Sequence, residues 1–245
     1  MSALHGQSTL EGSAGTAARL ERIAEAAAEV VNCIRVLEKS GSNLVTEVLD
    51  GGEFIEFEHY PRDDVYDPQT HAQYYFHAHP RARGAWNDYG HFHTFLRPKG
   101  VSQSVRPGVS PGTPGADAAS DSVFHLIAIS MNQQGRPVRL FTTNRWVTAE
   151  TWCAAPDIIA MLDRFVVDLA KPSWPLNRWI SAMITLYRDD IERLILERDV
   201  RIAQWSAAHP DRDVFEDRAL EVPSAMAIDV DTHLALIRSR LGLED

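Results

Sequence analysis

Hydrophobic positions recur at helical spacing at the start of the chain. From about Thr16 to Lys39, apolar residues return every three or four positions in an Ala-rich sequence, which predicts an amphipathic helix. Gly41 follows and is a typical residue at a helix C-terminus. Residues 1–14 are rich in Gly and Ser and are predicted to be a flexible N-terminus.

The middle of the chain has a different pattern, in which apolar and polar positions alternate. Residues 52–60 alternate, which predicts a strand that ends at Pro61 and is followed by a polar turn. Further strands are predicted in the segments that hold the paired histidines, over Val123–Met131 and over Val138–Thr143. About five antiparallel strands are therefore expected. Residues 98–120 are dense in Pro, Gly and Ser, which predicts a long loop.

After Trp146 the helical pattern returns. A helix is predicted within 149–170, with Thr148 as its N-cap, and a long one over 176–209. A last helix is expected after residues 230–232. The fold class is therefore predicted to be α+β, an antiparallel sheet packed by an N-terminal helix and a C-terminal helical layer. One domain is expected over 15–245, with its sheet part at about 53–145 and its helical part at about 148–245.

Composition narrows the function. The 245 residues carry a net charge of −10 with a pI near 5.4, which argues against binding to nucleic acid or to an anionic membrane. No apolar run is long enough to span a bilayer and no secretory signal is visible, so a cytoplasmic location is expected. A small-molecule substrate is the expected partner, and a homo-oligomer is left open. Cys33 and Cys153 are expected to be buried thiols.

The segment from Gln73 to Leu96 carries the strongest candidate chemistry. It contains two His-X-His pairs, His77 with His79 and His91 with His93. In a strand, residues i and i+2 lie on one face, so each pair directs both imidazoles the same way. Two such strands side by side would bring four imidazoles together. The sequence therefore predicts a site for a divalent transition metal, with Fe, Cu and Zn as candidates.

Details of this site are left open by the sequence. If only three of the four histidines bind, the metal keeps an open position, as catalysis requires. Ligand imidazoles also need an acceptor on their second nitrogen. The acids near enough in sequence to serve are Asp88, Asp63, Asp64, Glu56 and Glu58.

Other residues extend the predicted site. Tyr75, Trp86 and Phe95 accompany the histidines and could line a pocket for a planar ligand or cofactor. Asn144 and Arg145 follow a predicted strand and are the candidate catalytic residues, placed to hold an anionic group of the substrate. His59 and His125 also fall on apolar strand faces. They are interpreted as buried, hydrogen-bonded core histidines, with a ligand role as the alternative.

Several sequence motifs of this chain resemble those of a known protein family. The string QYYFHAHP…GHFHTFLRP, followed by LIAISMNQQGRPVRLFTTNRWVTAETW and LNRW, resembles an uncharacterised bacterial family, a domain of unknown function, over about residues 55–230. The resemblance implies that this stretch is one unit and implies no activity. The family pattern has an acidic residue and a further His before the second pair, where this chain has Asp88-Tyr89.

These observations lead to a functional hypothesis and two alternatives. The first is a metal-dependent enzyme acting on a small anionic or aromatic substrate, with a lean toward oxidoreductase chemistry because no general-base Glu accompanies the histidines. The second is a protein or enzyme that binds haem through one of the histidines. The third is a non-enzymatic binding or accessory protein with structural histidines. Motifs for P-loop nucleotide binding, Rossmann folds, serine hydrolases and zincins are absent from the sequence.

Overall fold

The strands form one antiparallel sheet in which they lie in chain order. A computed structural model describes residues 4–52, 54–79, 88–101, 122–240 and 242, with side chains from residue 17 onward. The sheet order is β1-β2-β3-β4-β5-β6, and every neighbouring pair is antiparallel. The strands are β1 Tyr60–Tyr66, β2 Ala72–His77, β3 Gly90–Leu96, β4 Phe124–Met131, β5 Pro137–Phe141 and β6 Ala225–Ala227. The predicted α+β class is confirmed.

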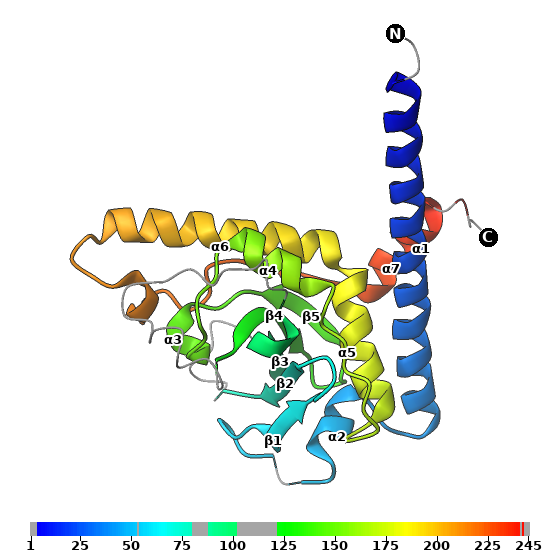
Figure 1. The fold of residues 1–245 in the computed structure, drawn as a ribbon. Coiled ribbons are helices and arrows are strands. Elements are labelled where there is room, and N and C mark those ends of the chain that lie inside the picture. Colours follow the sequence, from blue (N-terminus) through cyan, green and yellow to red (C-terminus); the bar gives the residue numbers. More distant parts are fainter. Residues whose placement is uncertain (1–3, 53, 80–87, 102–121, 241, 243–245) are drawn as a thin grey trace.

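Helices from both ends of the chain pack around this sheet. They are α1 Leu4–Lys39, α2 Leu44–Leu49, α3 Arg145–Thr148, α4 Ala155–Leu162, α5 Trp174–Leu186, α6 Arg188–Ala208 and α7 Val230–Arg240. Short 3-10 turns cover Pro98–Gly100 and Val214–Glu216. Helix α5 lies between α1 and the sheet, while α4 and α6 run side by side across one end (Figure 1). No helix in the described part of the chain combines the length and the apolar character that crossing a membrane would need.

The two faces of the sheet have different compositions. On one face Tyr74, Phe76 and Phe92 belong to the main hydrophobic core. There Trp179 of α5 packs 5.9 Å from Phe92, measured between ring centroids, and the Tyr74 hydroxyl donates to the Asn177 amide oxygen at 2.5 Å. The opposite face carries the histidines of β2 and β3, because successive residues of a strand point to opposite faces. Both faces of these two strands are buried.

Several predicted boundaries need correction at the edge of the sheet. The strand predicted over 52–60 is wrong: β1 begins only at Tyr60 and contains Pro61. A proline is tolerated there because β1 is an edge strand and its pairing with β2 shifts register between Tyr60 and Val65. The predicted helical part also contains the three-residue strand β6, which is too short to leave a pattern in the sequence.

The predicted helices are present, but their first and last residues differ from the prediction. Helix α1 begins at Leu4, well before the predicted Thr16; the flexibility of residues 1–14 stays a prediction. The long helix predicted over 176–209 is two helices, α5 and α6, which meet at the buried Tyr187. The helix predicted within 149–170 is confined to α4. Thr148 is the last residue of α3 rather than an N-cap, and Asn144 caps that helix instead.

Candidate metal centre

Three of the four predicted ligands converge. His77 lies directly opposite His91 in the β2–β3 pairing, and His93 follows two residues later on the same face of β3. Each of the three imidazoles offers one ligand atom such that these atoms lie within 4.8 Å of one another. All three side chains are buried, and His93 is 0% exposed. The predicted convergence of the two strands is confirmed, and this triad could hold a metal ion.

The Nε2 atoms of the three imidazoles are the candidate ligand atoms. The Nε2 atoms of His77 and His91 lie 2.8 Å apart. The Nε2 atom of His93 is buried and has no hydrogen-bond partner within the described structure. Nitrogens bound to one metal at about 2.1 Å are separated by about 3.0–3.4 Å, so His77 and His91 would have to move slightly apart, and the third imidazole somewhat inward, to share an ion. A buried nitrogen without a partner is costly unless something binds it.

Neutral imidazole is the form that binds metals, and burial favours it here. Burial, together with the neighbouring histidines, lowers the pKa of His77 to about 2. The same two causes place the pKa of His93 well below its usual value. Both imidazoles are therefore uncharged at neutral pH, with a lone pair available on each ring.

The second nitrogen of His91 has a carboxylate partner. His91 Nδ1 lies 3.3 Å from Asp88 Oδ2, and the hydroxyl of Ser130 donates to the same oxygen at 2.7 Å. Burial opposes ionisation of Asp88, but the hydrogen bonds from His91 and Ser130 outweigh it and lower the pKa of this carboxyl. Asp88 is thus the acid, among the five candidates, that contacts a triad histidine. Such a carboxylate orients a ligand imidazole and fixes its tautomer.

His79, the fourth predicted ligand, lies beside the triad but outside it. Its ring centroid is 4.8 Å from that of His77 and 5.4 Å from that of His91, and the side chain is only partly buried. Its other aromatic neighbour is Phe57. His79 lies outside the triad because β2 ends at His77. Beyond the end of the strand, the alternation that would align His77 with His79 no longer applies. Its role as a ligand stays a prediction.

The two remaining strand-associated histidines differ from each other. His125 is buried, and its Nε2 lies 3.0 Å from His93 Nδ1, which confirms the interpretation as a buried, hydrogen-bonded histidine. For His59 the predicted burial is wrong, although the side chain is hydrogen-bonded as expected. Its side chain is 40% exposed, because it precedes β1 in an irregular segment. It stacks on Tyr75 with centroids 3.6 Å apart, and its Nδ1 lies 2.9 Å from Asp64.

Aromatic side chains form a wall beside the triad. Tyr75 and Phe95 stack with centroids 5.5 Å apart, and Tyr75 lies 5.2 Å from the His93 ring. Phe141 of β5 packs against His91 at 5.2 Å, a contact that the sequence did not indicate. Trp86 lies outside the described residues. The structure brings Tyr75 and Phe95 to the metal centre, and their role in binding a cofactor or ligand stays a prediction.

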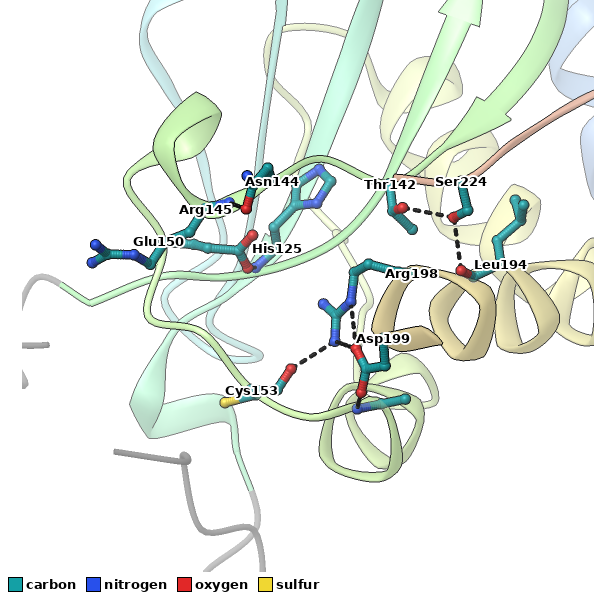
Figure 2. Close-up of polar contacts among 11 residues, drawn as sticks. His125, Thr142, Asn144, Arg145, Glu150, Cys153, Leu194, Arg198, Asp199 and Ser224 are labelled. Carbon is teal, nitrogen blue, oxygen red and sulfur yellow. Dashed lines mark hydrogen bonds and ion pairs between the residues drawn. The ribbon is translucent and has the colours of Figure 1, made fainter. Parts of the chain in front are cut away.

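Asn144 and Arg145 are engaged in structural contacts. The Asn144 amide nitrogen donates to the carbonyl oxygens of Val214 and Leu220, at 2.7 and 3.0 Å, and its side-chain oxygen accepts from the Arg145 backbone N–H. The Arg145 guanidinium pairs with Glu216. Figure 2 shows both side chains near His125 and Glu150, on the segment after β5. Their proposed hold on an anionic substrate stays a prediction.

The chain matches a known protein family by sequence. The sequence model of a family described as Domain of unknown function (DUF6969) matches residues 24–228. The chain belongs to the DUF6969 family. The matched range includes the whole six-stranded sheet and every residue of the triad, so the metal centre lies inside the DUF6969 domain. No curated protein and no solved structure matches the chain.

Proposed function

We propose that this DUF6969 protein binds one divalent transition metal through His77, His91 and His93 and uses it to act on a small molecule. The observation that carries the proposal is the buried Nε2 atom of His93, which has no partner in the described structure, in a ring whose ligand atom lies within 4.8 Å of those of His77 and His91. Three protein ligands leave further coordination positions for substrate, which is the arrangement of catalytic rather than structural sites.

The chemistry of the donors narrows the metal and the reaction. Imidazole ligands suit Fe, Cu, Zn and Ni. Among the described residues, the carboxylate that contacts the triad is that of Asp88, which orients His91, so it is not free to act as a general base in hydrolysis. This supports an oxidoreductase on Fe or Cu over a Zn hydrolase. The wall of Tyr75, Phe95 and Phe141 supports an aromatic or otherwise planar substrate more directly than an anionic one.

The triad geometry favours a single ion over haem. Haem iron already has four porphyrin nitrogens, which leave two axial positions on opposite sides of the ring. Three imidazoles with ligand atoms within 4.8 Å of one another match the coordination sphere of one ion better than two opposed axial positions. A haem protein would show a Soret band after purification. A non-enzymatic protein with structural histidines would keep its full stability after chelation.

Metal analysis tests the proposal. We expect the purified protein to carry close to one transition metal per chain, or to bind one equivalent of Co²⁺ in a titration followed by visible absorption. The double variant His77→Ala/His91→Ala removes two ligands and should bind no metal above background. His209→Ala serves as the matched control, because this imidazole caps α6 away from the triad. A wild-type protein that neither carries metal nor binds Co²⁺ or Zn²⁺ would overturn the proposal.

A further inference from the structure

A β-bulge brings a fourth buried imidazole into contact with the triad. Along β3 and β4, His93 pairs with Ala128 and Thr94 pairs with Ile127, but Phe95 pairs with His125 rather than with Leu126. Without this shift, Leu126 would share the face of Phe95, and His125 would point into the hydrophobic core on the other face. The extra residue therefore turns His125 toward His93. Bulges that re-aim one side chain in this way are over-represented next to active sites.

The buried side chains then form a continuous chain of hydrogen bonds. His93 Nδ1 lies 3.0 Å from His125 Nε2, and His125 Nδ1 lies 3.2 Å from the hydroxyl oxygen of Thr143. All three residues are at most 2% exposed. Burial is the largest cause that lowers the pKa of His125, to about 3, so this imidazole is neutral as well.

Only one of the two facing nitrogens, His93 Nδ1 and His125 Nε2, can carry a proton when both rings are neutral. Metal binding at His93 determines which of the two nitrogens carries it. When Nε2 of His93 offers its lone pair to a metal, the proton of that ring is on Nδ1. His93 Nδ1 then donates to His125 Nε2. The proton of His125 is consequently on its Nδ1, which donates to the hydroxyl oxygen of Thr143. Only this direction of donation leaves His93 Nε2 free for a metal.

We propose that His125 is a positioning residue of the metal centre, whose Nε2 accepts from His93 Nδ1 and so holds His93 in the tautomer that binds metal. This inference rests on the proposed function of the triad. His125 is itself fixed from behind, because its backbone N–H donates to Glu150 Oε2 at 3.0 Å, and Glu150 lies alongside it in Figure 2. Ligand histidines generally need an acceptor of this kind, and here it is a second histidine rather than a carboxylate.

Two substitutions separate positioning from packing. His125→Leu fills space but has no acceptor, and we expect it to weaken Co²⁺ binding about 10- to 100-fold, as loss of such partners generally does. His125→Gln keeps an acceptor oxygen near the place of Nε2 and should recover most of that affinity. Thr143→Val removes only the last acceptor of the chain, and a smaller loss in the same direction is expected. Circular dichroism and thermal melting establish that each variant is folded.

Nitrogen-15 NMR of the histidine side chains supplies a readout that packing alone would not move. In wild-type protein without metal, we expect both His93 and His125 as Nδ1–H tautomers. In His125→Leu, His93 should lose this preference, and in His125→Gln it should keep it. Equal Co²⁺ affinity in wild type and His125→Leu, with His93 still an Nδ1–H tautomer, would overturn the inference. A wild type that binds no metal but shows the expected tautomers would overturn the proposed function and the metal-positioning role with it, and only the direction of the His93–His125 hydrogen bond would stand.

Discussion

The two ring nitrogens of His91 face partners of different character. Nδ1 faces the Asp88 carboxylate, which at neutral pH can only accept a hydrogen bond, so Nδ1 carries the proton of this ring. Nε2 of His91 therefore has a lone pair. It lies 2.8 Å from Nε2 of His77, and two lone pairs at that distance repel each other. With His91 neutral and no metal bound, His77 is therefore the donor in this contact.

His77 should therefore change its tautomer when a metal binds. Without metal, nitrogen-15 NMR should show His77 as the Nε2–H tautomer and His91 as the Nδ1–H tautomer. Addition of one equivalent of Zn²⁺ should move the His77 proton to Nδ1 and leave His91 unchanged, because both Nε2 atoms must then offer lone pairs. His209, remote from the triad, is the internal control. An Nδ1–H form of His77 before metal addition would contradict the prediction.

At the scale of strands, much of the site could be predicted from sequence. Two His-X-His pairs on neighbouring strands must meet if the strands pair, because the side-chain period of a strand is two. The register His77–His91 realises this. The position of Asp88, three residues before His91, could be proposed as one of several acids, although the choice needed coordinates.

What the sequence could not predict follows from breaks in strand periodicity. His79 lies past the end of β2, so its side chain is not held to the face of His77. His125 reaches the site only through a bulge, which no alternation pattern records. Tyr60 and Pro61 start β1, where an edge position tolerates a proline that would end a central strand. Ser130 and Thr143 serve as partners only because strands distant in sequence are paired.

Gly90 lies where β3 closely approaches β2, so a larger residue at this position should disturb the pairing of the two strands. A Cβ atom at this position would lie 2.4 Å from Phe76 Cζ and 2.8 Å from the carbonyl oxygen of His77. Because one of these atoms is backbone, Gly90→Ala should force the strands apart where His77 pairs with His91. We expect a loss of about 1–3 kcal/mol in the free energy of unfolding, the usual cost of overpacking. Denaturant unfolding and Co²⁺ titration measure the two consequences, lower stability and weaker metal binding.

Gly52→Ala is the control for this substitution. Gly52 lies after α2, outside the sheet, and its Cβ would approach only the Leu49 carbonyl oxygen, at 3.0 Å. The free energy of unfolding of Gly52→Ala can fall as well, but its Co²⁺ affinity should stay at the wild-type value. If Gly90→Ala also binds Co²⁺ as wild type does, the spacing of these strands does not control the metal centre.

At the scale of the whole molecule, the sheet separates two kinds of interior. Its helix-covered face is packed with apolar side chains, whereas the opposite face buries at least four imidazoles, from His77, His91, His93 and His125. Buried neutral histidines reduce stability in acid, because the unfolded chain can bind protons that the folded chain cannot. The side of the sheet that provides the chemistry therefore also makes folding dependent on pH.

The sign and size of this dependence can be worked out for the protein without metal. The pKa values of His77 and His125, about 2 and about 3, and that of His93 lie below the unfolded value. Below about pH 6, each contributes a loss of about 1.4 kcal/mol in the free energy of unfolding per pH unit. Burial raises the pKa of Glu150 to about 7, so between about pH 4.5 and 7 this group acts in the opposite direction, with the folded state holding the extra proton.

These four groups together give the slope of two, roughly 3 kcal/mol lost per pH unit between about pH 6 and pH 4.5. Burial also lowers the pKa of His79, which adds to the loss in the same direction. Urea unfolding in the presence of a chelator, repeated across this range, measures it. Glu150→Gln removes the opposing group and should steepen the slope by about 1.4 kcal/mol per pH unit. A stability that is flat or rises toward acid would show that these imidazoles are protonated in the folded protein, and a charged triad would not bind a metal cation.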